Sequence, residues 1–116
     1  MEFTYEVIDD FILIHVKGDN LDASRSYDFK DEIKQLVEEK KIYRMVIDLS
    51  AVRFIDSSGL GCLIAALRLS HSGNGEVRLC GMCKQVRSVF ELVSLDKLFP
   101  TYQTPEDAVQ SFRVSV

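Results

Sequence analysis

The sequence predicts an α/β protein whose open, mixed and mostly parallel sheet has four to five strands, an N-terminal β-hairpin and about four helices. Apolar segments of strand length alternate with segments of helical periodicity, which is typical of strand–helix–strand units with right-handed crossovers. The first two apolar segments, 3–7 and 11–16, are joined by a link short enough for an antiparallel hairpin. The length of 116 residues fits one domain, so a single domain over residues 1–116 is expected.

The expected strands are short and largely apolar. Residues 3–7 alternate apolar and polar side chains, as in a strand with one wet face. Residues 11–16 and 45–49 are nearly all apolar, which is typical of central strands covered on both faces. Residues 76–80 alternate and indicate a strand nearer an edge. Leu98-Phe99 is expected to form a short last strand or an extended link.

Four helices are expected between and after these strands. The first follows a loop at 18–22 and runs from about Ala23 to Lys40. The second follows Asp56-Ser57-Ser58-Gly59 and runs to about His71, where Gly and Asn residues end it. The fourth begins at Thr104-Pro105, with a threonine cap and a proline at the first helical position. The apolar stripes are Phe29, Ile33, Leu36 and Val37; Leu60, Leu63, Ile64 and Leu67; Val86, Val89, Phe90 and Val93; and Ala108, Val109 and Phe112.

Composition excludes several classes of protein. The net charge is −4, and the Lys and Arg residues are scattered rather than gathered into the basic patch that nucleic acids require. No apolar run approaches the roughly 18 residues of a membrane span, and the N-terminus has no basic-then-apolar signal pattern. A cytoplasmic protein without direct nucleic-acid binding or membrane insertion is therefore expected.

The three cysteines are an odd number, whereas a secreted disulfide framework would use an even one. Cys62 lies within an apolar helix and is expected to be a small core residue. Cys80 and Cys83 form a C-x-x-C motif, which is either a redox pair or two thiols at an ordinary strand end and helix start. A structural zinc site wants four ligands, and only His15 and His71 are available to complete one. Neither a metal nor another cofactor is expected.

The segment Asp56-Ser57-Ser58-Gly59-Leu60-Gly61 is the most informative part of the chain. It stands between a buried strand and an apolar helix, where short polar residues cap the helix and backbone N–H groups point outward at its positive end. Such a place suits an anion, or a hydroxyl that becomes anionic by phosphorylation. The two glycines let another protein approach the backbone closely.

A catalytic role for Ser57 requires a general base. His15 is expected inside a strand. His71 lies at the far end of the helix that Ser57 begins, roughly 20 Å away at 1.5 Å per residue. The sequence therefore does not predict a Ser–His pair, and intrinsic catalysis is not expected.

Other catalytic signatures are equally weak. Gly59-Leu60-Gly61 lacks the third glycine of a dinucleotide loop, and no phosphate-binding G-x-x-x-x-G-K-[ST] loop occurs. Asp22, Asp48 and Asp56 all fall near strand ends, but caps of strands and helices account for them without invoking paired catalytic carboxylates.

The pattern Asp48-Leu49-Ser50-x-Val52-x-Phe54-x-Asp56-Ser57-Ser58-Gly59-Leu60-Gly61 resembles the signature of STAS-domain proteins, most closely that of bacterial anti-sigma-factor antagonists. The resemblance covers essentially the whole chain. It continues at Gly18, Leu21-Asp22, Leu79-x-Gly81, Val86-x-x-x-Phe90 and Leu95-x-x-x-Phe99. The family often reads Gly-x-Leu-Asp, whereas this chain is one residue longer between Gly18 and Leu21.

The resemblance implies the STAS fold and a phosphorylation switch. In the family the serine directly after the aspartate is phosphorylated, which here is Ser57. The kinase is the anti-sigma factor itself, a serine phosphatase reverses the step, and the unphosphorylated protein binds the anti-sigma factor so that the sigma factor is released. The loop aspartate, here Asp22, lies near that serine. The expected partner-binding residues are Asp22, Asp56, Ser58, Gly59, Leu60 and Gly61.

Two other functions are compatible with the sequence. One is a STAS regulatory subunit of a membrane transporter, such as a lipid-exporting ABC system, which would use the same helix face without a phosphoserine. The other is a thiol enzyme that uses Cys80 and Cys83.

Overall fold

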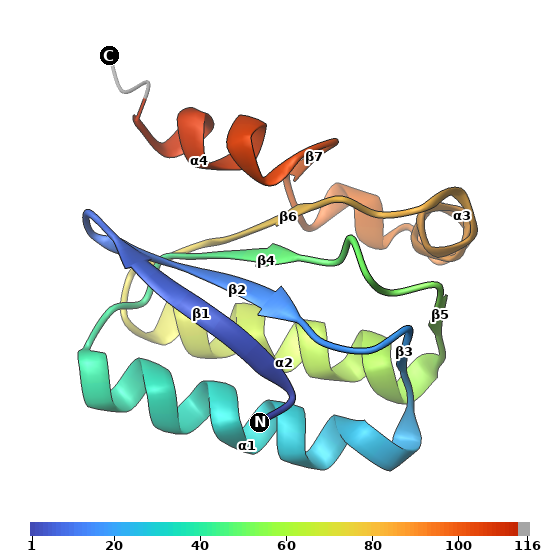
Figure 1. The fold of residues 1–116 in the computed structure, drawn as a ribbon, viewed down its shortest axis with the longest axis horizontal. Coiled ribbons are helices and arrows are strands. Elements are labelled where there is room, and N and C mark those ends of the chain that lie inside the picture. The colour runs from blue at the N-terminus through green and yellow to red at the C-terminus, as the bar shows by residue number, and fades with distance from the viewer. Residues whose placement is uncertain (114–116) are drawn as a thin grey trace.

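The computed structural model describes residues 1–113, and strands and helices alternate along it as the sequence predicts (Figure 1). The strands are β1 (Phe3–Ile8), β2 (Phe11–Val16), β3 (Asn20–Leu21), β4 (Met45–Asp48), β5 (Phe54–Ile55), β6 (Val77–Cys80) and β7 (Thr101–Tyr102). The helices are α1 (Ala23–Lys40), α2 (Ser57–Ser72), α3 (Lys84–Leu92) and α4 (Pro105–Arg113), with a short 3₁₀ turn at Leu95–Lys97.

The main sheet has five strands in the order β1-β2-β4-β6-β7. The β1–β2 hairpin is antiparallel, and β2–β4, β4–β6 and β6–β7 are parallel. Helices α1 and α2 cover one face of this sheet and α4 covers the other (Figure 1). The predicted mixed, mostly parallel sheet with a hairpin at one edge is confirmed.

The central strands are apolar on both sides because they divide two cores. Ile12 and Ile14 of β2 belong to the large cluster beneath α1 and α2. Phe11 and Leu13, which alternate with them, belong to the smaller cluster under α4, where Phe11 stacks on Phe112 with ring centroids 4.9 Å apart. Each such side chain contributes about 1.5–3 kcal/mol when it is fully buried.

The buried face of α2 consists of Leu63 and small residues rather than the whole predicted leucine stripe. Leu63 is fully buried, but Leu60, Ile64 and Leu67 are only half-buried against the core. The remaining buried positions of α2 are small residues, namely Gly59, Cys62, Ala66 and Ser70. The predicted stripe is therefore displaced towards small side chains, which bring α2 close to its neighbours. Cys62 is 3% exposed, so its predicted place in the core is confirmed.

Two segments differ from the sequence-based expectation. The loop expected at 18–22 contains β3, which pairs in parallel with β5 to form a separate two-stranded sheet. The last strand is Thr101–Tyr102 rather than Leu98-Phe99. Phe99 instead turns inward against Phe90, with ring centroids 6.3 Å apart, while Leu98 is left exposed.

Within residues 1–113, no helix is both long enough and apolar enough to cross a lipid bilayer.

Candidate functional site

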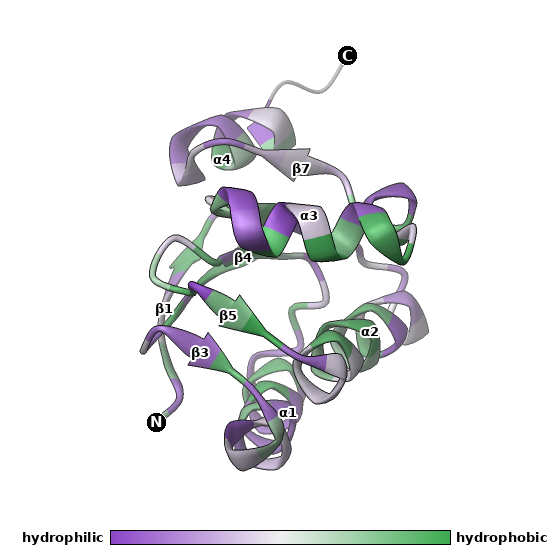
Figure 2. Ribbon diagram, turned by 90° about the vertical axis from the view of Figure 1, so that its right-hand side faces the viewer, coloured by the Kyte–Doolittle hydropathy of each residue, from purple (hydrophilic) through white to green (hydrophobic). Residues whose placement is uncertain are grey.

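The N-termini of α1 and α2 are brought together by the small β3–β5 sheet (Figure 2). Leu21 pairs with Ile55, and each strand leads after one residue into its helix. That one residue is Asp22 before α1 and Asp56 before α2. The parallel pairing therefore places the two helix-capping aspartates beside each other, at the positive ends of two helices.

Asp56 connects the two helices. Its Oδ1 accepts a hydrogen bond from the Gly59 N–H at 3.0 Å, which caps α2. Its Oδ2 accepts a hydrogen bond from the Ala23 N–H of α1 at 3.2 Å. Removal of this carboxylate would leave helix-terminal donors on both helices without their partner.

Asp22 caps α1 and is held by several donors. Its Oδ1 accepts hydrogen bonds from the Ser24 N–H at 3.1 Å and the Ser24 hydroxyl at 2.6 Å, and its Oδ2 accepts one from the Asn20 amide at 2.5 Å. The hydrogen bonds from Ser24, supported by the one from Asn20, lower the pKa of Asp22 below its ordinary value. Asp22 is therefore a fixed negative charge at neutral pH.

The two serines of the Asp-Ser-Ser-Gly segment have different surroundings. Ser57 is the first residue of α2 and is exposed. Ser58 is half-buried and lines a hollow with Ser26 and Tyr27 of α1. A second protein can therefore reach the Ser57 hydroxyl more directly than the Ser58 hydroxyl.

The two glycines of α2 also differ. Gly59 is buried, and a Cβ atom there would lie 2.1 Å from the Leu21 carbonyl oxygen and 2.7 Å from Ile55 Cγ1. The close approach at Gly59 is thus made by the chain's own β3 strand. Gly61 is exposed, and no atom of residues 1–113 outside its own helix lies within 4 Å of the corresponding Cβ position, so it leaves room for an outside molecule. Leu60, between them, is half-buried against the core.

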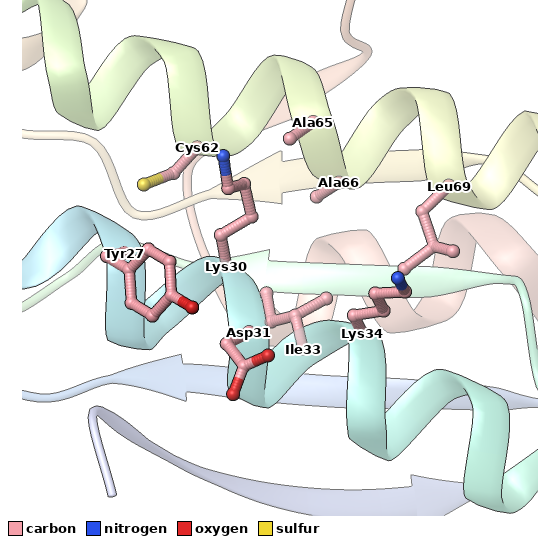
Figure 3. Close-up of a pocket in the computed structure, with 9 residues that line it drawn as sticks. All are labelled: Tyr27, Lys30, Asp31, Ile33, Lys34, Cys62, Ala65, Ala66 and Leu69. Atoms are coloured by element: carbon pink, nitrogen blue, oxygen red, sulfur yellow. The ribbon is translucent and has the colours of Figure 1, made fainter.

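A groove runs from this region along the α1–α2 seam (Figure 3). One hollow of about 310 Å³ is floored by apolar and small side chains that include Ile33, Cys62 and Ala66. Lys30 and Lys34 extend from α1 towards α2 across it (Figure 3). A second hollow of about 330 Å³ shares Lys30 and Cys62 with the first and reaches Ser58 and Gly61. The surface beside Ser57 therefore continues into a groove with basic side chains.

A second polar cluster lies at the carboxyl ends of β2 and β4, and the sequence did not predict it. His15 pairs across the sheet with Asp48, the last residue of β4, so His15 does stand at the carboxyl end of a strand. Its Nδ1 lies 2.7 Å from Asp48 Oδ2, and its Nε2 lies 3.2 Å from Glu6 Oε2. Burial lowers the pKa of His15, but the hydrogen bonds to Asp48 and Glu6 outweigh that effect and raise the pKa overall.

This cluster does not have the geometry of a catalytic triad. The Ser50 hydroxyl donates to Asp48 Oδ1, while His15 binds the other oxygen of the same carboxylate. The serine and the histidine are thus both partners of Asp48 rather than partners of each other, whereas nucleophilic activation needs a serine bonded to its base. Asp48 also accepts the Ser50 N–H at 3.0 Å, and so it caps the strand end as the sequence predicts.

The cysteines are free thiols in separate environments. Cys80 lies in the cluster under α4, whereas Cys83 packs against the core on the other face of the sheet. Burial, followed by the charges of Asp48 and Glu106, raises the pKa of Cys80 to about 12. A reactive thiol needs the opposite shift, towards the thiolate at neutral pH. In residues 1–113, no group of three or more His, Cys, Asp or Glu side chains is arranged to hold a metal ion.

Comparison with known proteins identifies relatives that span nearly the whole chain. Residues 2–108 match the STAS domain family. The anti-sigma F factor antagonist of Paenibacillus polymyxa is 23% identical over 103 residues, which are 89% of this chain and 87% of that protein.

The structure has neighbours with the same architecture. An anti-sigma factor antagonist from Mycobacterium paratuberculosis superimposes with a TM-score of 0.83 at 29% identity, over 96% of this chain and 92% of that one. The unphosphorylated form of the anti-sigma factor antagonist SpoIIAA gives a TM-score of 0.75 at 19% identity, over 97% and 99% of the two chains. The phosphorylated form of the Bacillus protein SpoIIAA gives 0.72 at 20% identity, over 95% and 98%.

Proposed function

The chain belongs to the STAS domain family, and from this we propose that it is an anti-sigma-factor antagonist controlled by phosphorylation of Ser57. In this proposal the unmodified protein binds an anti-sigma factor that is also a serine kinase, and the sigma factor is released. Phosphate on Ser57 ends the binding, and a serine phosphatase restores it. The protein acts by association and carries out no chemistry of its own. It works in the cytoplasm, where sigma factors act.

The observation that carries the proposal is that Ser57 is exposed at the start of α2, directly after the capping Asp56, where the two helix N-termini converge. Ser57 is exposed, and Asp56 and Asp22 lie on the two converging helix N-termini. A kinase can therefore reach the hydroxyl without unfolding either helix. The relatives named as antagonists extend over most of the chain and support the same assignment.

Phosphorylation would change the charge at this surface with little refolding. A phosphoserine carries about −1.5 to −2 charges at neutral pH. In the free protein the N-terminus of α2 favours a negative group, by about 0.3–1 kcal/mol for a surface charge. At a packed interface the same group would lose its water beside Asp56 and Asp22, whose hydrogen bonds hold them in place. Burying a charged group without a compensating partner is unfavourable, so the modification would weaken association.

The partner surface in this proposal extends from the aspartates along the outside of α2. Leu60 and Gly61 follow Ser57 and Ser58 on the same helix, and Gly61 offers an open approach to the backbone. Gly59 acts indirectly, because it lets β3 pass beneath the first turn of α2 and so holds Asp22 beside Asp56.

The test is phosphorylation of the purified protein by its cognate anti-sigma kinase with ATP, followed by mapping of the modified residue by mass spectrometry. Ser57→Ala should abolish incorporation of phosphate, and the matched variant Ser58→Ala should retain it. Ser57→Ala should still bind the kinase, since a smaller side chain fits the same interface. Ser57→Asp should bind more weakly than the unmodified protein but less weakly than phosphoserine, because it carries less charge and fewer acceptor oxygens.

Phosphate on Ser58 with Ser57 unmodified would contradict the assignment of the acceptor. Binding that is undiminished after full modification of Ser57 would contradict the switch itself. That second result would favour a constitutive regulatory subunit, such as one bound to a membrane transporter.

A further inference from the structure

Strand β1 leaves one long edge of the main sheet open. It is the first strand in the sheet order and pairs only with β2 among the described strands. The Lys17 N–H donates to the Glu2 carbonyl directly opposite, which marks a hydrogen-bonded position at the start of the ladder, while the Glu2 N–H donates to Glu32 Oε1. Hydrogen-bonded and non-hydrogen-bonded pairs alternate along an antiparallel ladder. Thr4, Glu6 and Ile8 therefore direct their backbone groups towards β2.

The alternate residues Phe3, Tyr5 and Val7 direct their backbone N–H and C=O groups away from β2. Strand β2 provides an independent check. Ile12 is the partner of Val7 in the register, and its N–H donates to the Arg44 carbonyl beside β4 rather than to β1. The open edge of β1 thus presents a row of donors and acceptors with no strand beyond it in the described chain.

This edge has few of the features with which proteins protect open strands. Protected edges are short, bulged, or carry charged residues, lysine above all, or proline. Strand β1 has six residues, pairs in continuous register without a bulge, contains neither lysine nor proline, and has Glu6 as its one charged residue. Two apolar side chains beside the open groups are also exposed, Tyr5 at 37% and Val7 at 47%.

We propose that β1 pairs with β1 of a second copy of this chain, in an antiparallel, two-fold symmetric dimer whose sheet is continuous across both copies. A two-fold axis at Tyr5 places Tyr5 opposite Tyr5 of the second copy and Phe3 opposite Val7 of the second copy. In each such pair the outward backbone groups exchange hydrogen bonds. The interface is self-complementary, as a two-fold contact must be.

The charged side chains of β1 favour this register over the two registers shifted by one residue. With the axis at Tyr5, the Glu6 carboxylate lies opposite Thr4 of the second copy, whose hydroxyl can donate to it. A shift of the axis to Glu6 would place two Glu6 side chains opposite each other. A shift to Thr4 would place Glu6 opposite Glu2 of the second copy. Like charges directly opposite in a sheet are destabilising, so only the Tyr5-centred register combines full overlap with compatible charges.

The experiment is sedimentation velocity of the purified chain over a wide range of concentration, with Val7→Pro as the disrupting variant. Proline removes the Val7 N–H, which the monomer's own sheet does not use, and proline is tolerated at outward positions of edge strands. The unmodified chain should form a concentration-dependent dimer, and Val7→Pro should raise the dissociation constant at least tenfold. Leu92→Lys is the matched control, because it removes an 84% exposed hydrophobic side chain outside β1 and should leave the dimer intact.

Amide hydrogen exchange on the unmodified chain gives a second readout that needs no variant. The amides of Tyr5 and Val7 should exchange more slowly as the chain is concentrated, while those of Thr4 and Glu6 should be protected at every concentration. A chain that stays monomeric throughout would overturn the proposal. So would a dimer that Val7→Pro leaves unchanged, or one in which the Tyr5 and Val7 amides remain unprotected. None of these outcomes bears on the phosphorylation of Ser57.

Discussion

Replacement of Gly59 by alanine is the sharpest test of how the two helix N-termini are held together. The added Cβ would lie 2.1 Å from the Leu21 carbonyl oxygen, which is backbone, and 2.7 Å from Ile55 Cγ1. Neither distance is tolerable without movement, and the nearer atom belongs to the strand that positions Asp22. Overpacking of this kind costs about 1–3 kcal/mol and exceeds the gain of about 0.5–1 kcal/mol that alanine normally brings to a helix interior.

Gly61→Ala is the matched control, since it makes the same chemical change two residues along the same helix. Outside its own helix, no atom of the described residues lies within 4 Å of its Cβ position, so only the helix-propensity gain of about 0.5–1 kcal/mol remains. Urea unfolding followed by circular dichroism should therefore show Gly59→Ala less stable, and Gly61→Ala more stable, than the parent chain. A Gly59→Ala protein as stable as the parent would refute the close crossing of β3 beneath α2.

Three further predictions follow from burial and charge. Leu63→Ala should lower the free energy of unfolding by about 2–5 kcal/mol, because Leu63 is fully buried, and a loss below about 0.5 kcal/mol would mean that this face of α2 is wrongly placed. The pKa of His15 is raised in the folded state, so the stability that its bonds to Asp48 and Glu6 contribute is complete below about pH 6.5 and is lost as the pH rises through the folded pKa. His15→Gln should remove that decline, and an identical pH profile in the variant would contradict it. A thiol reagent at neutral pH should modify half-buried Cys83 before Cys62 or Cys80, because those two are buried with raised pKa values; mass spectrometry of the folded protein after short exposure checks the order.

The helices could be predicted well because their signals are local. The first helix runs from Ala23 to Lys40, as the cap at Asp22 and the spacing of its apolar residues indicate. Asp56 likewise caps α2, as the sequence predicts. Capping side chains and a 3.6-residue period are features of neighbouring residues, so a helix can be predicted without knowledge of distant contacts.

The short strands β3 and β5 could not be predicted from the sequence because each has two residues, too few for any periodicity. Their pairing joins residues more than 30 positions apart, and only the folded chain brings Leu21 to Ile55. The same limit applies to the contact between His15 and Asp48. His15 lies one residue from the end of β2, and the apolar run 11–16 does not distinguish that position from an interior one.

Some features of the candidate site follow from the local sequence, and others depend on how distant segments pack. The caps at Asp56 and Asp22 and the exposed Ser57 follow from the local pattern, whereas the resemblance to a family was needed to assign Ser57 a role. The bond from the Ala23 N–H to Asp56 and the groove beside Ser58 depend on how α1 and α2 pack. Gly59 shows the difference most clearly. The sequence predicts that a partner protein approaches the Gly59 backbone, whereas in the structure the chain's own strand β3 makes that close approach.

The switch is tested most directly by the equilibrium affinity of the cognate anti-sigma kinase for two forms of this chain, unmodified and stoichiometrically phosphorylated on Ser57. Titration calorimetry with both forms measures the difference without a substitution that could disturb the cap of α2. The account predicts that phosphate weakens binding by about a hundredfold or more, which corresponds to about 2.8 kcal/mol. Equal affinities for the two forms would contradict the proposal that charge at the start of α2 controls association.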